Sequence, residues 1–133
     1  MSETNTNTHT SLRTKITTYF TSVDSSDLST TFSLLSPTAT FTIITAANTT
    51  FTGRDAIHAM LSDFVARSIT MEHRIWSMVV DEKAGRVATQ QRYIGTLKDG
   101  TENDMHTCNF FDFDKEGRIE KIMLWMAGET PLR

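Results

Sequence analysis

Apolar residues recur at helical spacing in the first half of the chain. Over residues 12–23 they stand three or four positions apart, and Ser11 is placed to cap this helix: Leu12, Ile16, Tyr19, Phe20 and Val23. A shorter helix is predicted after Ser25–Asp27, stopped by Pro37, with an inner face of Leu28, Phe32 and Leu35. The clearest helical stripe follows Thr52–Asp55 and consists of Ile57, Met60, Leu61, Phe64 and Val65. The pattern therefore predicts three helices.

The pattern changes to β-branched and aromatic residues after Pro37, which is typical of strands. Two short strands are predicted at 39–44 and 50–52. Four longer strands are predicted at 69–80, 86–97, 101–113 and 118–126, separated by turns that each contain a glycine. Helices followed by an antiparallel meander indicate an α+β fold, a cone-shaped barrel in which three N-terminal helices pack on a curved antiparallel sheet around one pocket.

The last predicted strand is apolar on both faces. Ile119, Met123 and Trp125 point one way, and Ile122, Leu124 and Met126 point the other. A solvated face would alternate with charged residues. We therefore expect one face to cover the core and pocket, and the outer face to form a homodimer.

Composition and charge narrow the possible partners and compartments. The 133 residues carry a net charge of -3 without a basic block, which argues against nucleic acid. Residues 1–10 contain no apolar stretch, so we expect a disordered tail before a single domain at 11–133, with no signal peptide or membrane span. The single cysteine, Cys108, agrees with a reducing, cytoplasmic environment.

Three motifs occur in an order that resembles a known superfamily. They are Tyr19-Phe20 leading to Asp27-Leu28, the segment 51–57 (FTGRDAI) and the segment 111–119 (FDFDKEGRI). From Leu12 onward the chain resembles the nuclear-transport-factor-2-like superfamily. It is most similar to SnoaL-like polyketide cyclases and their isomerase relatives, and more distantly to ketosteroid isomerase. The resemblance implies a conical homodimer whose pocket takes a hydrophobic small molecule and performs acid/base chemistry without a metal or cofactor.

The ketosteroid isomerase pattern matches this chain only in part. Its oxyanion-hole tyrosine corresponds to Tyr19, and its oxyanion-hole carboxylic acid corresponds to Asn109. A hydroxyl and an amide can still donate two hydrogen bonds to a developing enolate. The position of its general base is Ile43, and the aspartate usual near the end of the last strand of SnoaL-like cyclases is also missing, in the stretch that ends at Ala127.

His73 is the candidate that replaces the missing acids, because several relatives carry an inward histidine at this position. Imidazole suits proton transfer near neutral pH. The alternative is an exposed strand end, since Glu72 and Arg74 flank His73. Tyr19 has the alternative of a core aromatic, and Asn109 that of a structural amide joining strands.

Four further residues are assigned to substrate binding. Trp125 and Met123 would line the pocket, with ordinary core packing as the alternative, and Phe111 is assigned to substrate binding with them. Arg92 stands in the polar stretch 90–93, which predicts either a polar pocket wall or a dimer interface.

The leading functional hypothesis is a cofactor-free isomerase or cyclase of a polyketide-type or terpenoid-type secondary metabolite. One alternative is a non-catalytic dimeric module that binds a ligand or docks a partner. A dehydratase or hydrolase on the same scaffold is the other. The first two differ in whether His73, Tyr19 and Asn109 converge on a common cavity.

Overall fold

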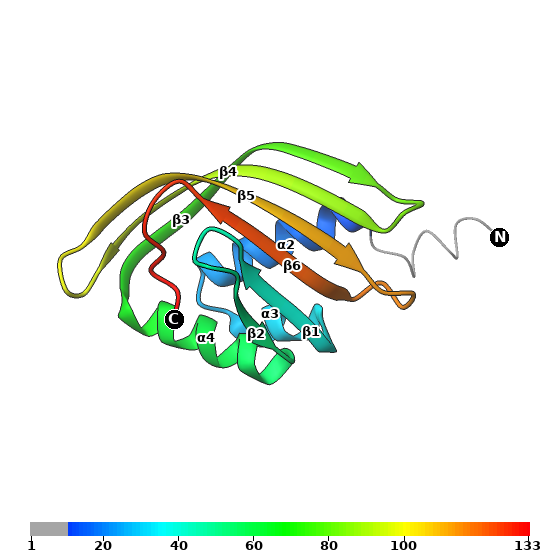
Figure 1. Cartoon of the computed structure of the whole chain (residues 1–133), viewed down its shortest axis with the longest axis horizontal. Coiled ribbons are helices and arrows are strands. Elements are labelled where there is room, and N and C mark those ends of the chain that lie inside the picture. The colour runs from blue at the N-terminus through cyan, green and yellow to red at the C-terminus, as the bar shows by residue number, and fades with distance from the viewer. Residues whose placement is uncertain (1–10) are drawn as a thin grey trace.

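The computed structural model describes residues 11–133, in which three helices pack against a six-stranded sheet (Figure 1). The helices are α2 (Leu12–Asp24), α3 (Leu28–Ser33) and α4 (Arg54–Arg67). The strands are β1 (Leu35–Ile43), β2 (Thr49–Thr52), β3 (Ser68–Asp81), β4 (Arg86–Leu97), β5 (Glu102–Phe113) and β6 (Ile119–Met126). The tail predicted at residues 1–10 lies outside the described residues.

The helix starts follow from local hydrogen bonding. At the start of α2 the Ser11 hydroxyl accepts the backbone N–H of Thr14 at 3.2 Å. The Asp27 carboxylate accepts the backbone N–H of Thr30 at the start of α3. Gly53 precedes α4 and has a φ of 93°, a backbone conformation that favours glycine. The three predicted helix starts are thus confirmed.

The sheet has the strand order β2-β1-β6-β5-β4-β3. Every neighbouring pair is antiparallel except β1 and β6, which run parallel. The α+β class is therefore confirmed, but the sheet is mixed rather than antiparallel. The edge strands β2 and β3 do not pair with each other, because the chain between them forms α4. The cone consequently stays open instead of closing as a barrel.

The second helix is shorter than predicted. It ends at Ser33, and Leu35, expected on its inner face, instead begins β1 and pairs with Ile119 of β6. The pairing of β1 with β6 shifts between Leu35 and Thr40. Pro37 lies in this irregular stretch, where its missing N–H breaks no regular ladder hydrogen bond. Proline here marks a bulge in a strand rather than the stop of a helix.

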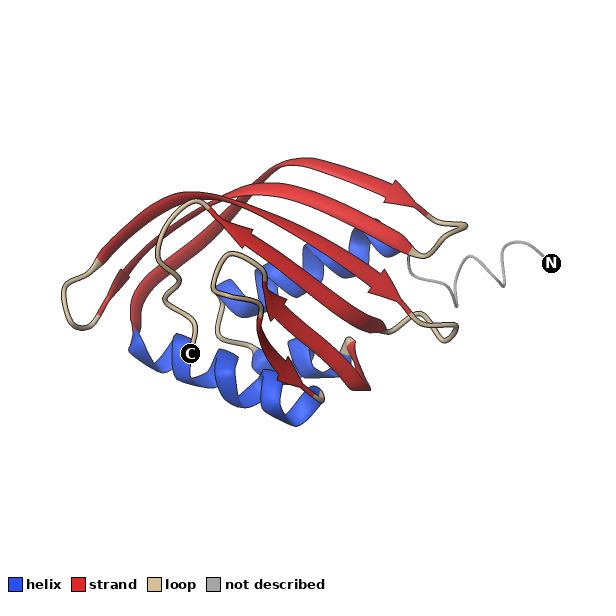
Figure 2. Cartoon of the chain, viewed as in Figure 1, coloured by secondary structure: helices blue, strands red, loops and turns tan. Residues whose placement is uncertain are grey.

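The helices lie against the concave face of the curved sheet (Figure 2). Inward-facing side chains of the sheet meet the buried stripes of the helices. Besides Ala39, six large side chains are 0% exposed: Ile16, Leu35, Ile57, Phe111, Ile119 and Ile122. Burying one such side chain stabilises the fold by about 1.5–3 kcal/mol. This core holds the helices on the sheet and positions the walls of the site described below.

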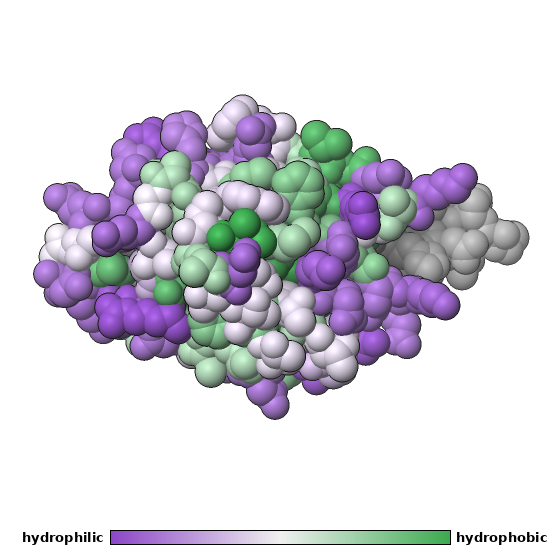
Figure 3. Space-filling model, viewed as in Figure 1, coloured by the Kyte–Doolittle hydropathy of each residue, from purple (hydrophilic) through white to green (hydrophobic). Residues whose placement is uncertain are grey.

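The convex face of the sheet carries large apolar side chains that the described chain leaves open to solvent. Trp76, Val79 and Phe110 are 60%, 66% and 45% exposed. Trp76 is the extra residue of a bulge, since the pairing of β3 with β4 shifts between Ile75 and Ser77. In the view of Figure 3, apolar patches are separated by polar side chains.

Candidate active site

A cavity lies between the helices and the concave face of the sheet. Apolar side chains of α2, α4 and β6 form most of its wall: Phe20, Val23, Leu61, Phe64, Leu124 and Met126. The empty space among the lining residues is about 490 Å³, with the open mouth and its solvent included. Apolar walls around a few polar groups are typical of sites that bind small organic molecules.

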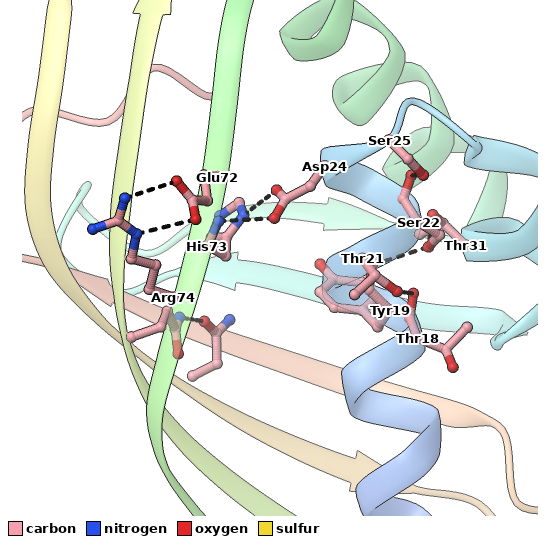
Figure 4. Close-up of polar contacts among 12 residues, drawn as sticks. Thr18, Tyr19, Thr21, Ser22, Asp24, Ser25, Thr31, Glu72, His73 and Arg74 are labelled. Atoms are coloured by element: carbon pink, nitrogen blue, oxygen red, sulfur yellow. Dashed lines mark hydrogen bonds and ion pairs between the residues drawn. The ribbon is translucent and has the colours of Figure 1, made fainter.

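A carboxylate and an imidazole meet at the wall of this cavity. Asp24, the last residue of α2, lies beside His73 of β3 (Figure 4). Asp24 Oδ1 is 2.6 Å from His73 Nδ1, and Asp24 Oδ2 accepts the backbone N–H of His73 at 2.8 Å. The two side chains are only 21% and 15% exposed. A carboxylate that accepts both hydrogen bonds requires the proton on Nδ1, which leaves a lone pair on Nε2.

Aromatic rings hold the imidazole of His73 from two sides. The ring of Tyr93 stacks on it with the centroids 5.3 Å apart, and the ring of Phe20 lies at 5.2 Å. Tyr93 is the direct partner of His73 in the β3–β4 ladder, and Phe20 is one helical turn before Asp24. The orientation of His73 is therefore fixed by packing as well as by hydrogen bonds.

Tyr19 enters the same cavity from α2. Its ring packs edge-on against Phe20 and Phe111, and the side chain is buried. Burial raises the pKa of Tyr19 well above the usual value, so the hydroxyl stays protonated across the physiological range. Tyr19 can therefore donate a hydrogen bond to a ligand oxygen.

The floor of the cavity is polar where β4 and β5 pair. Gln91, Thr107 and Asn109 line it, and all three are buried. The Gln91 Nε2 group donates to Asn109 Oδ1. A polar floor beneath apolar walls is typical of a site that orients its ligand by a few hydrogen bonds.

The C-terminal segment closes one side of the cavity. Pro131 and Leu132 belong to its lining, and an Arg67 N–H donates to the Pro131 carbonyl. Arg67 Nε also lies 2.8 Å from an Asp63 carboxylate oxygen on the same helix. The end of α4 therefore fastens the segment that covers the cavity.

The structure brings the three predicted catalytic residues together. His73, Tyr19 and Asn109 come from three different elements, and all line the one cavity. Phe111 does not belong to that lining, but its fully buried ring supports Tyr19 and Phe20 from behind. Phe111 is therefore a core residue behind the cavity wall, and not part of the lining predicted for it.

The other three residues assigned to substrate binding lie outside the cavity. Trp125 and Met123 project from the convex face of β6, where the Trp125 ring meets Phe110 at 5.4 Å. The pocket side of β6 consists of the alternate residues, because a strand exposes successive side chains to opposite faces. Arg92 is exposed on the same convex face and forms a 2.6 Å ion pair with Asp104. These three residues cannot line the cavity.

Two residues of the site were not singled out from the sequence as site residues. The sequence does contain a signal for Asp24. A carboxylate in the last turn of a helix lies at the negative end of the helix dipole, so a hydrogen-bond donor from another element is needed to stabilise it. Gln91 occurs in the polar stretch 90–93, where strand alternation places Gln91 and Tyr93 inward and Gln90 and Arg92 outward. The stretch 90–93 therefore contributes side chains to the pocket wall and to the convex face alike.

The described residues contain neither a metal-binding cluster nor a membrane-spanning helix. Between residues 11 and 133, no three His, Cys, Asp or Glu side chains cluster closely enough to hold a metal ion. Across the same residues, none of the helices has the length and apolar character needed to cross a bilayer.

Several solved structures share this fold at low sequence identity. A candidate SnoaL-like polyketide cyclase from Shewanella denitrificans OS-217 has a TM-score of 0.77 and 15% identity, covering 86% of this chain and 89% of its own. Bal32a, from a soil-derived mobile gene cassette, has a TM-score of 0.76 and 18% identity, covering 87% and 88%. An NTF2-like protein of unknown function from Exiguobacterium sp. 255-15 has a TM-score of 0.75 and 18% identity, covering 86% and 99%. No curated protein matches the chain.

These similarities show that the chain has the conical α+β fold of these proteins. The family model described as the SnoaL-like domain matches residues 16–122. The chain therefore belongs to the SnoaL-like family, as its motifs predict.

Proposed function

We propose that this chain is a cofactor-free enzyme that moves a proton at a carbon next to a carbonyl group. It acts as an isomerase or cyclase on a polyketide-type or terpenoid-type secondary metabolite. One observation carries the proposal: His73, oriented by Asp24, faces the same cavity as Tyr19 and Asn109. Candidate polyketide cyclases among the proteins of like fold agree with this substrate class.

The first step is removal of a proton from the substrate carbon. The Nε2 lone pair of His73 forms the new N–H bond, and the electrons of the broken C–H bond move to the carbonyl oxygen to give an enolate. Asp24 stabilises the imidazolium that results, because its carboxylate already accepts the Nδ1 proton.

The enolate oxygen is stabilised by hydrogen-bond donors in an apolar cavity. The Tyr19 hydroxyl donates, since its raised pKa keeps it protonated, and the Asn109 amide provides the second donor. His73 then returns its proton to a different carbon, which completes an isomerisation. In a cyclisation the enolate carbon attacks a second carbonyl group, and His73 protonates the new alkoxide.

The alternative of a non-catalytic ligand carrier accounts for the cavity but not for the dyad. A carrier of apolar ligands needs no imidazole held by two hydrogen bonds with its second nitrogen free. Convergence of His73, Tyr19 and Asn109 on one cavity is what the enzyme hypothesis requires.

Ring opening of nitrobenzisoxazole tests the base without knowledge of the natural substrate. This flat, neutral compound opens to a coloured phenolate when a base removes the C–H proton of its isoxazole ring and the N–O bond breaks. The wild-type chain should catalyse the opening, and His73→Gln should slow it by about two to four orders of magnitude. The matched control is His106→Gln, which changes a histidine on the convex face. Equal rates for wild type and His73→Gln would remove His73 from the mechanism.

Product masses distinguish the reaction types on a natural extract. Isomerisation and aldol-type cyclisation without dehydration leave the substrate mass unchanged. A dehydratase, which the same base would serve, gives a product lighter by one water.

The partners and the compartment complete the proposal. The substrate is hydrophobic, and two copies associate through the convex face, where Trp76, Val79 and Phe110 are exposed. Sedimentation at the mass of a single chain would contradict the dimer. A cytoplasmic location fits the free thiol of Cys108.

A further inference from the structure

The cavity floor holds two polar groups, Gln91 and Thr107, that the proposed mechanism does not use, beside Asn109, which it does. Gln91, Asn109 and Thr107 are 1%, 3% and 6% exposed. Gln91 of β4 and Thr107 of β5 are direct cross-strand partners, and Asn109 is the next inward residue along β5. All three therefore form one compact group on the sheet.

Hydrogen bonding within this group is incomplete. Gln91 Nε2 donates to Asn109 Oδ1, which leaves Gln91 Oε1 as a buried acceptor without a partner among residues 11–133. The Thr107 hydroxyl is likewise buried and unpartnered within those residues. Buried polar groups are nearly always paired in folded proteins. Tyr93, a third lining residue, also has a buried hydroxyl without a partner among residues 11–133. The unpartnered groups of Gln91 and Thr107, side by side on the floor, point to a ligand that completes their hydrogen bonds.

The amide pair offers the same chemistry whichever amide is the donor. If Gln91 donates to Asn109, a Gln91 acceptor and an Asn109 donor remain. If the two amides rotate and exchange roles, an Asn109 acceptor and a Gln91 donor remain. In both arrangements the pair presents one donor and one acceptor. Its complement is a ligand with a carbonyl oxygen close to a hydroxyl group.

Charge in the cavity further defines the ligand. The described lining includes no Lys or Arg, and its ionisable side chains are His73, Tyr19 and Tyr93. The one nearby carboxylate, Asp24, is bound to His73. A carboxylate or phosphate ligand would lose its hydration here without gaining a fixed cation. The lining therefore favours a neutral molecule.

We infer that the substrate is a compact, neutral hydroxy-carbonyl compound whose hydroxyl group binds Gln91 and Thr107. This inference rests on the proposed function for the carbonyl end, where Tyr19 and Asn109 donate to the oxygen. The ligand hydroxyl donates a hydrogen bond to Gln91 Oε1 and accepts one from the hydroxyl of Thr107. Gln91 is two residues from Tyr93 on the same face, a rise of about 7 Å. The hydroxyl thus lies about one ring away from the base, which makes Gln91 and Thr107 specificity residues.

Three sets of indanones test the inference by binding alone. Hydroxyindanones, with the hydroxyl at successive ring positions, are compared with methylindanones of the same shape and with carboxyindanones. Calorimetry with the wild-type chain should show that the best hydroxyindanone binds about tenfold more tightly than its methyl counterpart. Carboxyindanones should bind most weakly. Tighter binding of the methyl or carboxy compounds, or no binding by any hydroxyindanone, would overturn the inference.

Thr107→Val separates recognition from structure. Removing an unpartnered buried hydroxyl should leave the denaturation midpoint unchanged or raise it, while abolishing most of the preference for hydroxyl over methyl. Gln91→Met provides a second variant of similar shape, and Gln90→Leu on the convex face is the matched control. A variant that loses stability but keeps the preference for hydroxyl would assign the group to structure instead.

Both measurements on the wild-type chain keep this inference separate from the proposed function. If the hydroxyl preference is present but nitrobenzisoxazole is not opened, the subsite stands and the reaction does not. If nitrobenzisoxazole is opened without any hydroxyl preference, the base stands and the subsite does not.

Discussion

Asp24 directs both oxygens of its carboxylate to one residue. One oxygen binds the imidazole of His73 and the other binds its backbone N–H, so the side chain and the strand are fixed together. The rings of Phe20 and Tyr93 prevent the imidazole from turning. A base whose hydrogen bonds are formed before the substrate enters needs little reorganisation during the reaction.

Asp24→Asn tests this orientation without changing the size of the side chain. The amide removes the negative charge and can donate to Nδ1, which favours the tautomer that has its proton on Nε2. The rate of nitrobenzisoxazole opening should fall by about a hundredfold or more. Glu72→Gln is the matched control, since Glu72 precedes His73 but pairs with Arg74 and is exposed (Figure 4). Equal losses in both variants would show a general effect of charge.

The predicted and observed site residues differ because a sequence pattern shows local spacing but not which distant segments come into contact. Tyr19, His73 and Asn109 could be predicted because motif order and strand alternation place them. Asp24 reaches His73 across 49 positions, and that distance closes only when α2 docks on the sheet. Trp125 and Met123 were misplaced because β6 is apolar on both faces, so hydrophobicity alone does not say which is inward.

At the scale of elements, β4 divides its side chains between two tasks. Gln91 and Tyr93 face the cavity, while Gln90 and Arg92 face outward. The same strand contains Gly95, next in the inward row. A Cβ there would lie 2.7 Å from the Tyr93 hydroxyl oxygen and 2.8 Å from the Thr70 carbonyl oxygen of β3.

Gly95→Ala should therefore destabilise the pairing of β3 and β4. The backbone oxygen of Thr70 cannot yield without distorting the strand, so we expect a loss of about 1–3 kcal/mol in the free energy of unfolding. Urea denaturation measures it. Gly128→Ala is the control, since its Cβ would meet only Met105 at 3.7 Å. A denaturation midpoint equal to that of Gly128→Ala would contradict the predicted clash.

The elements themselves were largely predictable, because capping residues and glycine turns act locally. The second helix was the exception. Pro37 was read as a helix stop, but Leu35 is already held in a strand by its pairing with Ile119, a contact between distant segments. The pairing of β1 with β6 therefore determines where α3 ends, and the spacing of apolar residues along the helix does not show this pairing.

At the scale of the whole molecule, both tyrosines of the chain are buried. Burial is the main cause that raises the pKa of Tyr93, as it raises that of Tyr19. The folded chain therefore binds these two protons more tightly than the unfolded chain does. Stability contributed by the neutral hydroxyls is fully present below the ordinary tyrosine pKa of 10.0 and is lost as the pH rises above it.

An alkaline titration should show the coupling directly. Tyrosinate absorbance and the loss of circular dichroism should rise over the same pH interval, above the ordinary tyrosine pKa, because ionisation requires unfolding. Tyr19→Phe should roughly halve the absorbance change, since one of the two tyrosines is removed. Full tyrosinate absorbance with an unchanged dichroism spectrum would mean that the hydroxyls are open to solvent.

The overall architecture could be predicted from motif order, but the open edge could not. Closure of the sheet depends on whether the edge strands β2 and β3 pair with each other. The sequence of a strand has the same pattern whether its edge is paired or free. The parallel contact of β1 with β6 was equally hidden, since it joins segments from opposite ends of the sequence.

The bond between Asp24 and His73 also joins the first helix described to an edge strand of the sheet. In the proposed mechanism, the imidazole of His73 is therefore oriented only after these distant segments have come together, and closing long loops is slow. We expect activity to reappear during refolding no earlier than the docking of α2. Turnover would then report when α2 docks on the sheet.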